Sequence, residues 1–476
     1  MTIYDTIVVG AGVAGLTAAR LLSGAGRSVL VLEARDRVGG RVHTQRSDGL
    51  VTDLGASWIH GVDDNPLVDV VRAFGMPMAE FTVGSFQPDG RPIAYYGPGG
   101  NRLSAADAER FAADVHTVDE LLDRTVATSR PGDSYETAVE TALAGLDWRP
   151  ERVERVREFL RHRTEEQYGV WIADLDAHGL DDDQVEGDEV VFPEGYDRLA
   201  TRLADGLDVR LAHVVGSVRW SHDGVSVTSD RGKFRADRVV VTVPIGVLKS
   251  PELLIDPPLP EPLAGAIERL EPNHFEKVVL RFPDRFWDDG VYAIRRQGDA
   301  GRWWHSWYDL TDLHGVPTLL TFAAGPCAEA IRTWDDDAVA ASVLASLREI
   351  YSDAVAEPDH VLVTRWRDDP FARGSYGYLT VGASPEDHDL LATPVEGVLH
   401  IAGEVTWSED PATVTAARSA PDTASPRPSS ARRSPSAPSG LDPEESTQAA
   451  STWAARNSSQ VSVPAGVSED RLTPAR

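Results

Sequence analysis

Short apolar runs flank one stretch of helical spacing near the amino terminus. Residues 5–9 are rich in β-branched side chains and predict a short buried strand. Residues 16–22 carry apolar side chains at helical spacing, and residues 28–32 form a second apolar run that ends before Glu33. This order of strand, helix and strand is typical of an α/β protein.

The same periodicities recur along the middle of the chain. Residues 104–128 and 150–163 have amphipathic helical spacing. Alternation predicts strands at 209–218 and 225–229, and residues 236–243 predict a buried strand that ends at Pro244. At roughly 100–200 residues per domain, the 476 residues allow two or three domains or a single large α/β body.

Composition adds a constraint on partners. Hydrophobic residues make up 42% of the chain, which is enough for a buried core. The 46 Lys and Arg residues face 75 Asp and Glu residues, so the net charge is -29. This balance argues against a nucleic-acid partner, because neutralising phosphates needs a basic face. It suits either a cationic small molecule or an acidic surface that is simply solvated.

Metal sites and membrane segments are not indicated. Cys327 is the single cysteine, so intramolecular disulfides and Cys-cluster metal sites are excluded. The acidic stretch 174–189 lacks calcium-loop spacing and is interpreted as a solvated loop, or as a surface that steers a cationic amine. No apolar run approaches the ~18 residues of a membrane helix, and the start does not resemble a signal peptide. We therefore expect a soluble protein of the cytoplasm without metal.

A glycine-rich turn follows the first predicted strand. Residues 10–15 read G-x-G-x-x-G, and an acid, Glu33, follows a little over twenty residues later. Gly10 permits a tight turn, Gly12 lets the backbone approach a pyrophosphate, and Gly15 lets helix and strand pack closely. The helix amino terminus offers N–H groups, and Glu33 can accept ribose hydroxyls. The whole arrangement predicts a dinucleotide site.

The residues after Glu33 indicate which dinucleotide. Residues 33–41 add a second glycine pair and three arginines, which suit the diphosphate of a buried FAD better than a nicotinamide cofactor. Residues 53–61 then read Asp-Leu-Gly-Ala-Ser-Trp-Ile-His-Gly. Here the chain resembles the flavin-containing amine oxidases, the family of monoamine oxidase and polyamine oxidase. It looks most similar to the polyamine oxidase branch, and the resemblance covers roughly residues 4–414.

The resemblance implies a set of cofactor-binding residues. It places FAD against Gly10, Gly12, Ala14, Gly15, Glu33, Ala34, Arg35, Gly40, Arg41, Ala56, Ser57, Trp58, Val215, Glu404, Thr413 and Val414. Ordinary strand packing is the alternative for Val215. Monoamine oxidases attach FAD through a cysteine near Thr413, and Cys327 lies elsewhere in the sequence. The flavin is therefore expected to be non-covalent.

Three residues are candidates for the chemistry. Lys277 is one of three lysines in the chain, and its segment resembles the one whose lysine holds a water against flavin N5; a surface salt bridge is the alternative. Tyr376 matches an aromatic ring near the flavin face, or is a core tyrosine. His60 is interpreted as the group that recognises a polyamine nitrogen, or as a structural histidine.

The resemblance breaks off near the end of the chain. After Val414 the family continues with a Gly- and Ala-rich helix, whereas here Pro421, Pro426 and Pro428 forbid its continuation. The composition then becomes rich in Pro, Ser, Ala and Arg, so we expect residues 420–476 to be disordered. An abrupt change inside a motif suggests a reading-frame shift in the gene, and it puts tight FAD binding in question.

Together these features predict a two-domain α/β flavoprotein. We expect a Rossmann-like FAD-binding domain built from discontinuous segments, with a mixed-sheet and helical substrate domain between them. The FAD-binding segments are 1–84, 190–260 and 391–419, the last of them truncated or frameshifted. The helical part of the substrate domain is 85–189 and its sheet part is 261–390.

The implied reaction removes a hydride from the carbon next to an amine nitrogen. Water hydrolyses the resulting imine, and dioxygen reoxidises the flavin and leaves as hydrogen peroxide. Two alternative functions on the same fold are those of an amino-acid oxidase and of a flavin desaturase. An amino-acid oxidase needs an arginine for the substrate carboxylate. A non-catalytic remnant with a broken carboxyl terminus is a further alternative. The expected partners are a small amine and dioxygen, and the residues set no oligomeric state.

Overall fold

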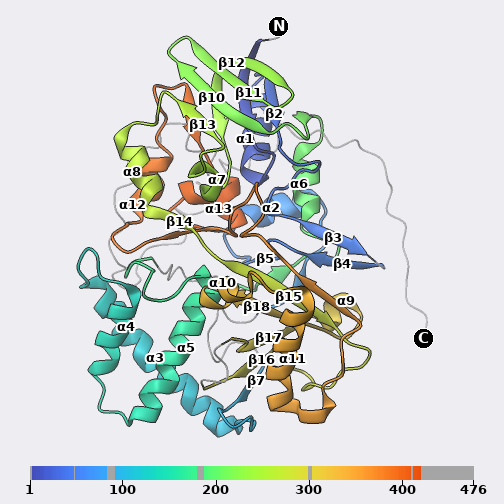
Figure 1. Ribbon diagram of the computed structural model, residues 1–476, viewed down its shortest axis with the longest axis vertical. Coiled ribbons are helices and arrows are strands. Elements are labelled where there is room, and N and C mark those ends of the chain that lie inside the picture. The colour runs from blue at the N-terminus through green and yellow to red at the C-terminus, as the bar shows by residue number, and fades with distance from the viewer. Residues whose placement is uncertain are drawn as a thin grey trace, which may run out of the picture. The chain divides into compact units, whose positions relative to one another are not determined.

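The computed structural model describes residues 3–47, 49–82, 92–179, 187–298, 303–408 and 411–419. The expected disordered tail, residues 420–476, lies outside these ranges, as do residues 180–186 of the acidic stretch 174–189. Two main sheets organise the described residues. Figure 1 shows the first of them, with helix α1, at one end, and the second, with helices α3, α4, α5 and α11, at the other.

The first sheet has eight strands within the described ranges and runs in the order β13-β10-β11-β12-β1-β2-β9, with β21 added beside β12. Its central strands β12, β1 and β2 are parallel, with Val9 between Val241 and Leu32. The strands are β1 (Ile3–Val9), β2 (Val29–Leu32), β9 (Asp208–Arg210), β10 (Val215–Ser221), β11 (Gly224–Ser229), β12 (Gly232–Val241), β13 (Leu254–Asp256) and β21 (Leu399–Ile401).

Both faces of this sheet are buried, which is why β2 and the last three residues of β1 are apolar. Val8 and Val31 face the core that is shared with helices on one side, whereas Ile7 and Leu30 belong to the core on the other side. The helices that contribute to the first core are α1 (Val13–Gly24), α2 (Pro66–Ala73), α6 (Asp197–Ala204) and α13 (Val414–Ser419). Near the second core lie α7 (Ile245–Leu248), α8 (Glu261–Arg269) and α12 (Glu386–Leu391).

The second sheet has six strands among the described residues, in the order β19-β15-β18-β17-β16-β7. It is antiparallel except where β7 runs parallel to β16. Its strands are β7 (Ile93–Tyr96), β15 (Phe275–Arg281), β16 (Ala293–Arg296), β17 (Ser306–Asp309), β18 (Thr318–Ala324) and β19 (His360–Val363).

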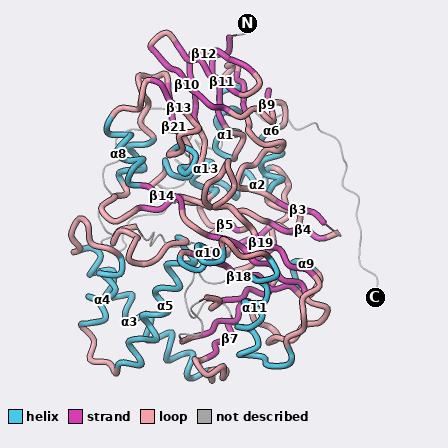
Figure 2. Tube along the Cα trace, in the orientation of Figure 1, coloured by secondary structure: helices cyan, strands magenta, loops and turns pink. Residues whose placement is uncertain are grey.

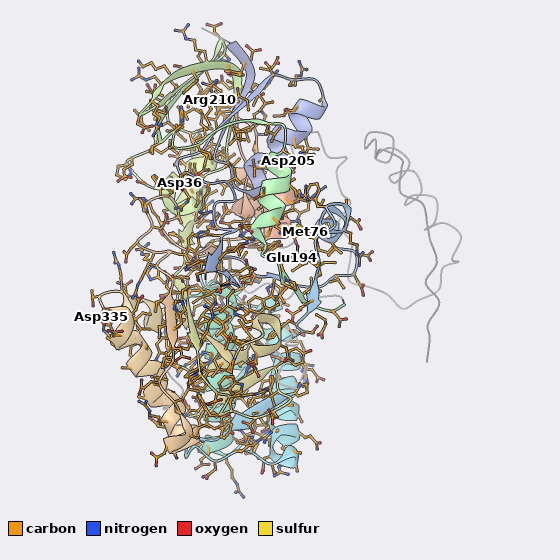
Figure 3. The ribbon with its side chains drawn as sticks, turned by 90° about the vertical axis from the view of Figure 1, so that its right-hand side faces the viewer. Asp36, Met76, Glu194, Asp205, Arg210 and Asp335 are labelled. Carbon is orange, nitrogen blue, oxygen red and sulfur yellow. The ribbon has the colours of Figure 1, made fainter. Side chains whose placement is uncertain are left out.

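Helices complete this half of the fold, and Figure 2 shows them beside the strands β7 and β18. One group shares a core of its own and comprises α3 (Ala105–Ala127), α4 (Tyr135–Ala144) and α5 (Pro150–Tyr168). The others are α9 (Thr311–His314), α10 (Pro326–Ile331), α11 (Asp336–Tyr351) and the 3-10 turn η2 (Ser352–Ala354). A second 3-10 turn, η3 (Glu404–Thr406), lies against α12 and α13 of the other half. Figure 3 labels Arg210 in the eight-stranded sheet and Asp335, which caps α11 in the other half.

Three small sheets connect the two halves. Strand β3 (Thr44–Ser47) pairs with β4 (Leu50–Asp53), and β14 (Leu270–Pro272) pairs with β20 (Gly377–Leu379). In the third, β8 (Val190–Val191) lies between β5 (Trp58–Ile59) and β6 (Ala79–Glu80). The register of the third sheet brings residue 60 beside residue 189.

The mixed α/β architecture agrees with the prediction, and the local differences have physical causes. Helix α3 lies within the predicted range 104–128, and the Ser104 side chain caps its amino terminus. The strand expected over 209–218 is two strands, because the chain turns at Ala212, where φ is 55°. Helix α5 continues to Tyr168, beyond the predicted end at residue 163. The apolar periodicity stops before the helix does, because the last turns of the helix are buried although their side chains are polar. Among the described helices, none combines the length and the apolar character that a bilayer crossing needs.

Candidate functional site

A cavity of about 1660 Å³ lies between the two main sheets. Typical small-molecule pockets have volumes of about 300–1,000 Å³, so this one has room for a large cofactor together with a substrate. Apart from Gly15, every residue that the sequence analysis assigned to the cofactor or to the chemistry lines it. The chain therefore brings together positions from 10 to 414 around one space.

The glycine-rich turn forms one wall. Gly10 leaves β1 with φ of 106°, a conformation that favours glycine, and its N–H donates to Leu32 O at 2.8 Å. Gly15 lies behind the wall, where an added Cβ would come within 2.1 Å of Gly10 O. Helix α1 starts after Gly12 with no side-chain cap, so its first N–H groups stay available to an anion in the cavity.

The second glycine pair packs against the first turn. The Gly39 N–H donates to Ala11 O at 2.8 Å, and a Cβ on Gly40 would lie 3.4 Å from Gly12 Cα. The absence of side chains at these glycines keeps the two loops close together. This packing explains why two glycine motifs occur within thirty residues of each other.

The side chain of Arg41 connects this region to residues that lie more than 300 positions later in the sequence. Its guanidinium donates to Glu404 Oε1 and to Ser375 O, both at 2.9 Å. Glu404 is buried, and its Oε2 has no hydrogen-bond partner among the described residues. A buried oxygen without a donor is costly, so Glu404 Oε2 is suited to accept a hydroxyl from a bound molecule.

Acidic and basic groups meet at another part of the wall. Glu33 accepts hydrogen bonds from Ala11 N at 2.6 Å and Arg35 N at 2.9 Å, so it stabilises the loop and retains lone pairs for a ribose. The Arg35 side chain forms a two-pronged pair with Asp369, at 2.6 and 2.8 Å. Ala34 and Val215 complete this wall, the latter at the start of β10.

These features fit a dinucleotide. The uncapped amino terminus of α1 suits a diphosphate, Glu33 suits a ribose, and the unpartnered Glu404 oxygen suits a further hydroxyl.

Lys277 enters the cavity from strand β15. Its ammonium donates to Asp53 O at 3.1 Å, to Gly55 O at 2.6 Å and to Ser57 Oγ. Its Nζ also lies 5.6 Å from the centre of the Trp58 ring. Burial lowers the pKa of Lys277 to about 8, although nearby Asp53 opposes this shift, and burial raises the pKa of Asp53 to about 6. The surface salt bridge considered for Lys277 is thus wrong, because the side chain is buried among oxygens of residues 53–57.

Five aromatic residues form a continuous wall of the cavity. In order of contact they are Tyr376, Phe275, Phe322, Tyr308 and Trp58. Successive ring centres are separated by 5.8, 4.7, 5.5 and 6.4 Å. The Tyr376 hydroxyl donates to Gln167 O at 2.7 Å, so the outer end of this ring is held in place. The rings are tilted against one another, and together they present a largely apolar surface along which a hydrocarbon chain can lie.

The last described segment closes the cavity. Ala56, Thr413 and Val414 line it, and α13 begins at Val414 and ends before Pro421. Val414 and Ala417 pack on the core that α1 and α2 share, and Thr415 is within hydrogen-bond distance of Asn65. The helix that the sequence analysis treated as lost is therefore present as a short piece.

His60 lies where β5 ends. Its Nδ1 is 2.5 Å from Glu189 Oε1, and the imidazole lines the cavity while Glu189 is fully buried. The interpretation of residues 174–189 as a solvated loop is therefore wrong for Glu189. The buried segment that contains β8 therefore begins at Glu189, within the acidic stretch.

Several lining residues could not be singled out from local motifs. They come from helices and strands of the substrate side and include Asp119, Tyr135, Arg163, Glu166 and Tyr308. Glu166 accepts from the Tyr308 hydroxyl at 2.9 Å, and Arg163 pairs with Asp119 at 2.9 Å. The buried polar end of α5 was the available signal, since charged residues there interrupt an amphipathic pattern.

Cys327 lies elsewhere, as its sequence position indicated. It is buried in α10 within the core of the six-stranded sheet, and it is not among the described residues that line the cavity. Burial raises the pKa of its thiol well above the usual range.

Comparison with known proteins agrees with this geometry. Residues 13–424 match the model of the family described as flavin containing amine oxidoreductase, ten residues beyond the point where the sequence analysis ended the resemblance. Polyamine oxidase 2 of Arabidopsis thaliana is 33% identical over 86% of this chain and 85% of its own length. Lysine-specific histone demethylase 2 of Homo sapiens is 31% identical over 87% of this chain, which spans only 52% of that relative.

A solved structure of wild-type putrescine oxidase bound to putrescine has the same fold. Its TM-score is 0.73 at 23% sequence identity, over 89% of this chain and 98% of that one. The family match extends over most of the described residues and includes almost all of the cavity wall. The chain therefore belongs to the family of flavin-containing amine oxidoreductases.

Proposed function

We propose that the chain is an FAD-dependent amine oxidase that holds FAD without a covalent bond and oxidises a C–N bond of a polyamine or another amine. One observation carries the proposal. A single cavity contains the glycine turn with the uncapped α1 and also Lys277 with the aromatic wall. A cofactor site and a place for an apolar amine chain are thus continuous.

Residues of this chain would hold the cofactor by their backbone and by a few acids. Gly10, Gly12 and Ala14 would surround the diphosphate, Glu33 the ribose and Glu404 the ribityl hydroxyls. Thr413 and Val414 would approach the isoalloxazine ring. A bound flavin supplies the two-electron acceptor for the amine and passes those electrons to dioxygen, which leaves as hydrogen peroxide.

The aromatic wall and Lys277 would serve the reaction directly. The wall excludes water and aligns the carbon next to the amine nitrogen, whose hydride is removed to give an imine that water then hydrolyses. Tyr376 lies at one end of the wall. The Lys277 ammonium, fixed by three oxygens, would stabilise negative charge that develops near it.

The arginines favour an amine over an amino acid. Among the described residues that line the cavity, the arginines are Arg35, Arg41 and Arg163. Each already pairs with a carboxylate, at 2.6, 2.9 and 2.9 Å respectively. An amino-acid oxidase needs an arginine for the substrate carboxylate, and these three are engaged. The name of the 33% identical polyamine oxidase supports the same choice.

A second candidate substrate is a lysine side chain within a peptide. Its support is the 31–33% identity to lysine-specific histone demethylases of Homo sapiens and Oryza sativa, of which this chain spans about half.

Oxygen uptake with a panel of substrates tests the proposal. Purified protein loaded with FAD should consume oxygen and release an equal amount of peroxide with spermine, and much less with an L-amino acid or a methylated histone peptide. The variant Lys277→Met tests the role of the buried lysine and should oxidise spermine much more slowly. Lys233→Met, at an exposed lysine, is its matched control. A flavin-loaded protein that oxidises only the amino acid or only the peptide would overturn the choice of substrate, and a protein that takes up no flavin would favour the non-catalytic remnant.

A further inference from the structure

The ladder between β5 and β8 places two chemical groups side by side. Its register pairs Trp58 with Val191 and Ile59 with Val190. One step further along the same antiparallel register brings residue 60 opposite residue 189. His60 Nδ1 and Glu189 Oε1 are 2.5 Å apart there, although 129 residues separate them in sequence.

The two partners differ sharply in burial. The Glu189 side chain is 1% exposed, whereas that of His60 is 41% exposed and lines the cavity. The main chain of Glu189 is fixed on both sides, since its N–H donates to Thr82 Oγ1 at 3.0 Å and its carbonyl accepts from Phe81 N at 2.8 Å. The carboxylate is therefore held in a rigid position behind the imidazole.

This arrangement defines what the imidazole can offer. A carboxylate accepts a hydrogen bond, so the ring nitrogen that faces it is assigned as the donor, Nδ1–H. In a neutral ring the other nitrogen, Nε2, is then an acceptor. An acceptor backed by a buried negative charge attracts the N–H groups of an ammonium and is poorly suited to an anion.

We propose that Glu189 is a positioning residue that acts through His60: it fixes the imidazole so that the ring binds the non-reacting nitrogen of a diamine or polyamine. The inference rests on the proposed amine oxidase function and adds a preference for substrates with two or more nitrogens. A monoamine has no second nitrogen and gains nothing from the pair.

A double-mutant cycle tests this role. The variants are Glu189→Gln, His60→Gln and the two combined, each in the flavin-loaded full chain. A Gln amide can present either its oxygen or its NH2 group, so it no longer fixes the ring. Asp188→Asn is the matched control, because Asp188 is the neighbouring acid, is exposed, and is not among the described residues that line the cavity.

Two readouts are taken, namely spermine binding by anaerobic calorimetry and steady-state oxidation of spermine and benzylamine. Glu189→Gln should weaken spermine binding and raise its KM by about tenfold or more, leave kcat within about twofold, and leave benzylamine unchanged. The combined variant should match His60→Gln alone, because Glu189 acts through that ring. Asp188→Asn should behave as the wild type.

Other outcomes overturn the inference. These are unchanged spermine binding in Glu189→Gln, an equal effect on benzylamine, or a further loss on top of His60→Gln, which would mark a general structural role. If Glu189→Gln unfolds, Glu189→Asp is measured instead, because it keeps the charge on a shorter side chain. Glu189→Asp should bind spermine with intermediate affinity. Wild-type affinity in this variant would contradict the requirement for close contact between the carboxylate and His60. Spermine that binds wild type without being oxidised would refute the proposed function and leave the binding role of the pair standing.

Discussion

Gly15→Ala adds one methyl group at the contact between the glycine turn and helix α1. The added Cβ would lie 2.1 Å from Gly10 O and 2.7 Å from Thr242 Oγ1. Thr242 cannot turn away freely, because its hydroxyl donates to Val9 O at 2.9 Å. Ordinary van der Waals contact begins at 3.4 Å, so α1 and the turn must separate by about 1 Å.

This separation affects both stability and the cofactor site. Overpacking of this kind costs about 1–3 kcal/mol, and each kcal/mol lowers the Tm of a large domain by about 2–4 °C. The same movement displaces the N–H groups at the start of α1, which would hold the diphosphate. Gly24→Ala is the matched control, since a Cβ on Gly24 of the same helix meets nothing within 4 Å and a helical Ala stabilises by about 0.5–1 kcal/mol over Gly.

The assay is the flavin absorbance per chain after purification, together with the Tm. Gly15→Ala should lose most of its flavin and unfold several degrees below the wild type (roughly 2–12 °C from the figures above). Gly24→Ala should retain flavin and unfold slightly higher. A Gly15→Ala protein with the flavin content and the Tm of Gly24→Ala would refute the reasoning, because the close contact would then have no consequence.

Three further predictions concern Lys277 and Asp53. Lys277→Met should lower the rate of amine oxidation about a hundredfold, whereas Lys233→Met should not change it; oxygen uptake measures both. Because burial lowers the pKa of Lys277 to about 8, wild-type activity that needs the ammonium should fall as the pH rises through about 8, and a flat profile there would contradict that need. Burial raises the pKa of Asp53 to about 6, above the ~3.9 of an Asp side chain in an unfolded chain. Protonation of Asp53 therefore stabilises the fold fully below about pH 4, and this stabilisation is lost as the pH rises through about 6. Asp53→Asn, which keeps Oδ1 for both of the hydrogen bonds that this atom accepts, should therefore raise stability by about 1–2 kcal/mol at neutral pH and by less at pH 4 in urea unfolding.

The sequence predicted those parts of the fold in which neighbouring residues decide the structure. Strand, turn and helix at the amino terminus follow from apolar runs and from glycines whose spacing has one physical use. Helix α3 follows from its periodicity. The break at Ala212 was not predicted, because alternation continues through it and only the positive φ interrupts the strand.

Several residues of the candidate site could not be predicted without the tertiary structure. Glu189 belongs to an acidic stretch by composition, and only the ladder with β5 reveals that it is buried against His60. Likewise Phe322 and Tyr308 come from ordinary apolar strands, and their place in the aromatic wall follows from the order of strands in the sheet. Motifs predicted that Lys277 and Tyr376 lie at the site, and both line the cavity, but the motifs did not predict the neighbours that hold them.

The central claim is that this chain carries flavin in the cavity and transfers electrons to it from a polyamine. The most direct test is the absorbance spectrum of the FAD-loaded chain without oxygen, before and after spermine is added. The account predicts a flavin spectrum that bleaches with spermine and returns when air is admitted. A spectrum unchanged by spermine, or a chain that binds no flavin even in excess FAD, would contradict it.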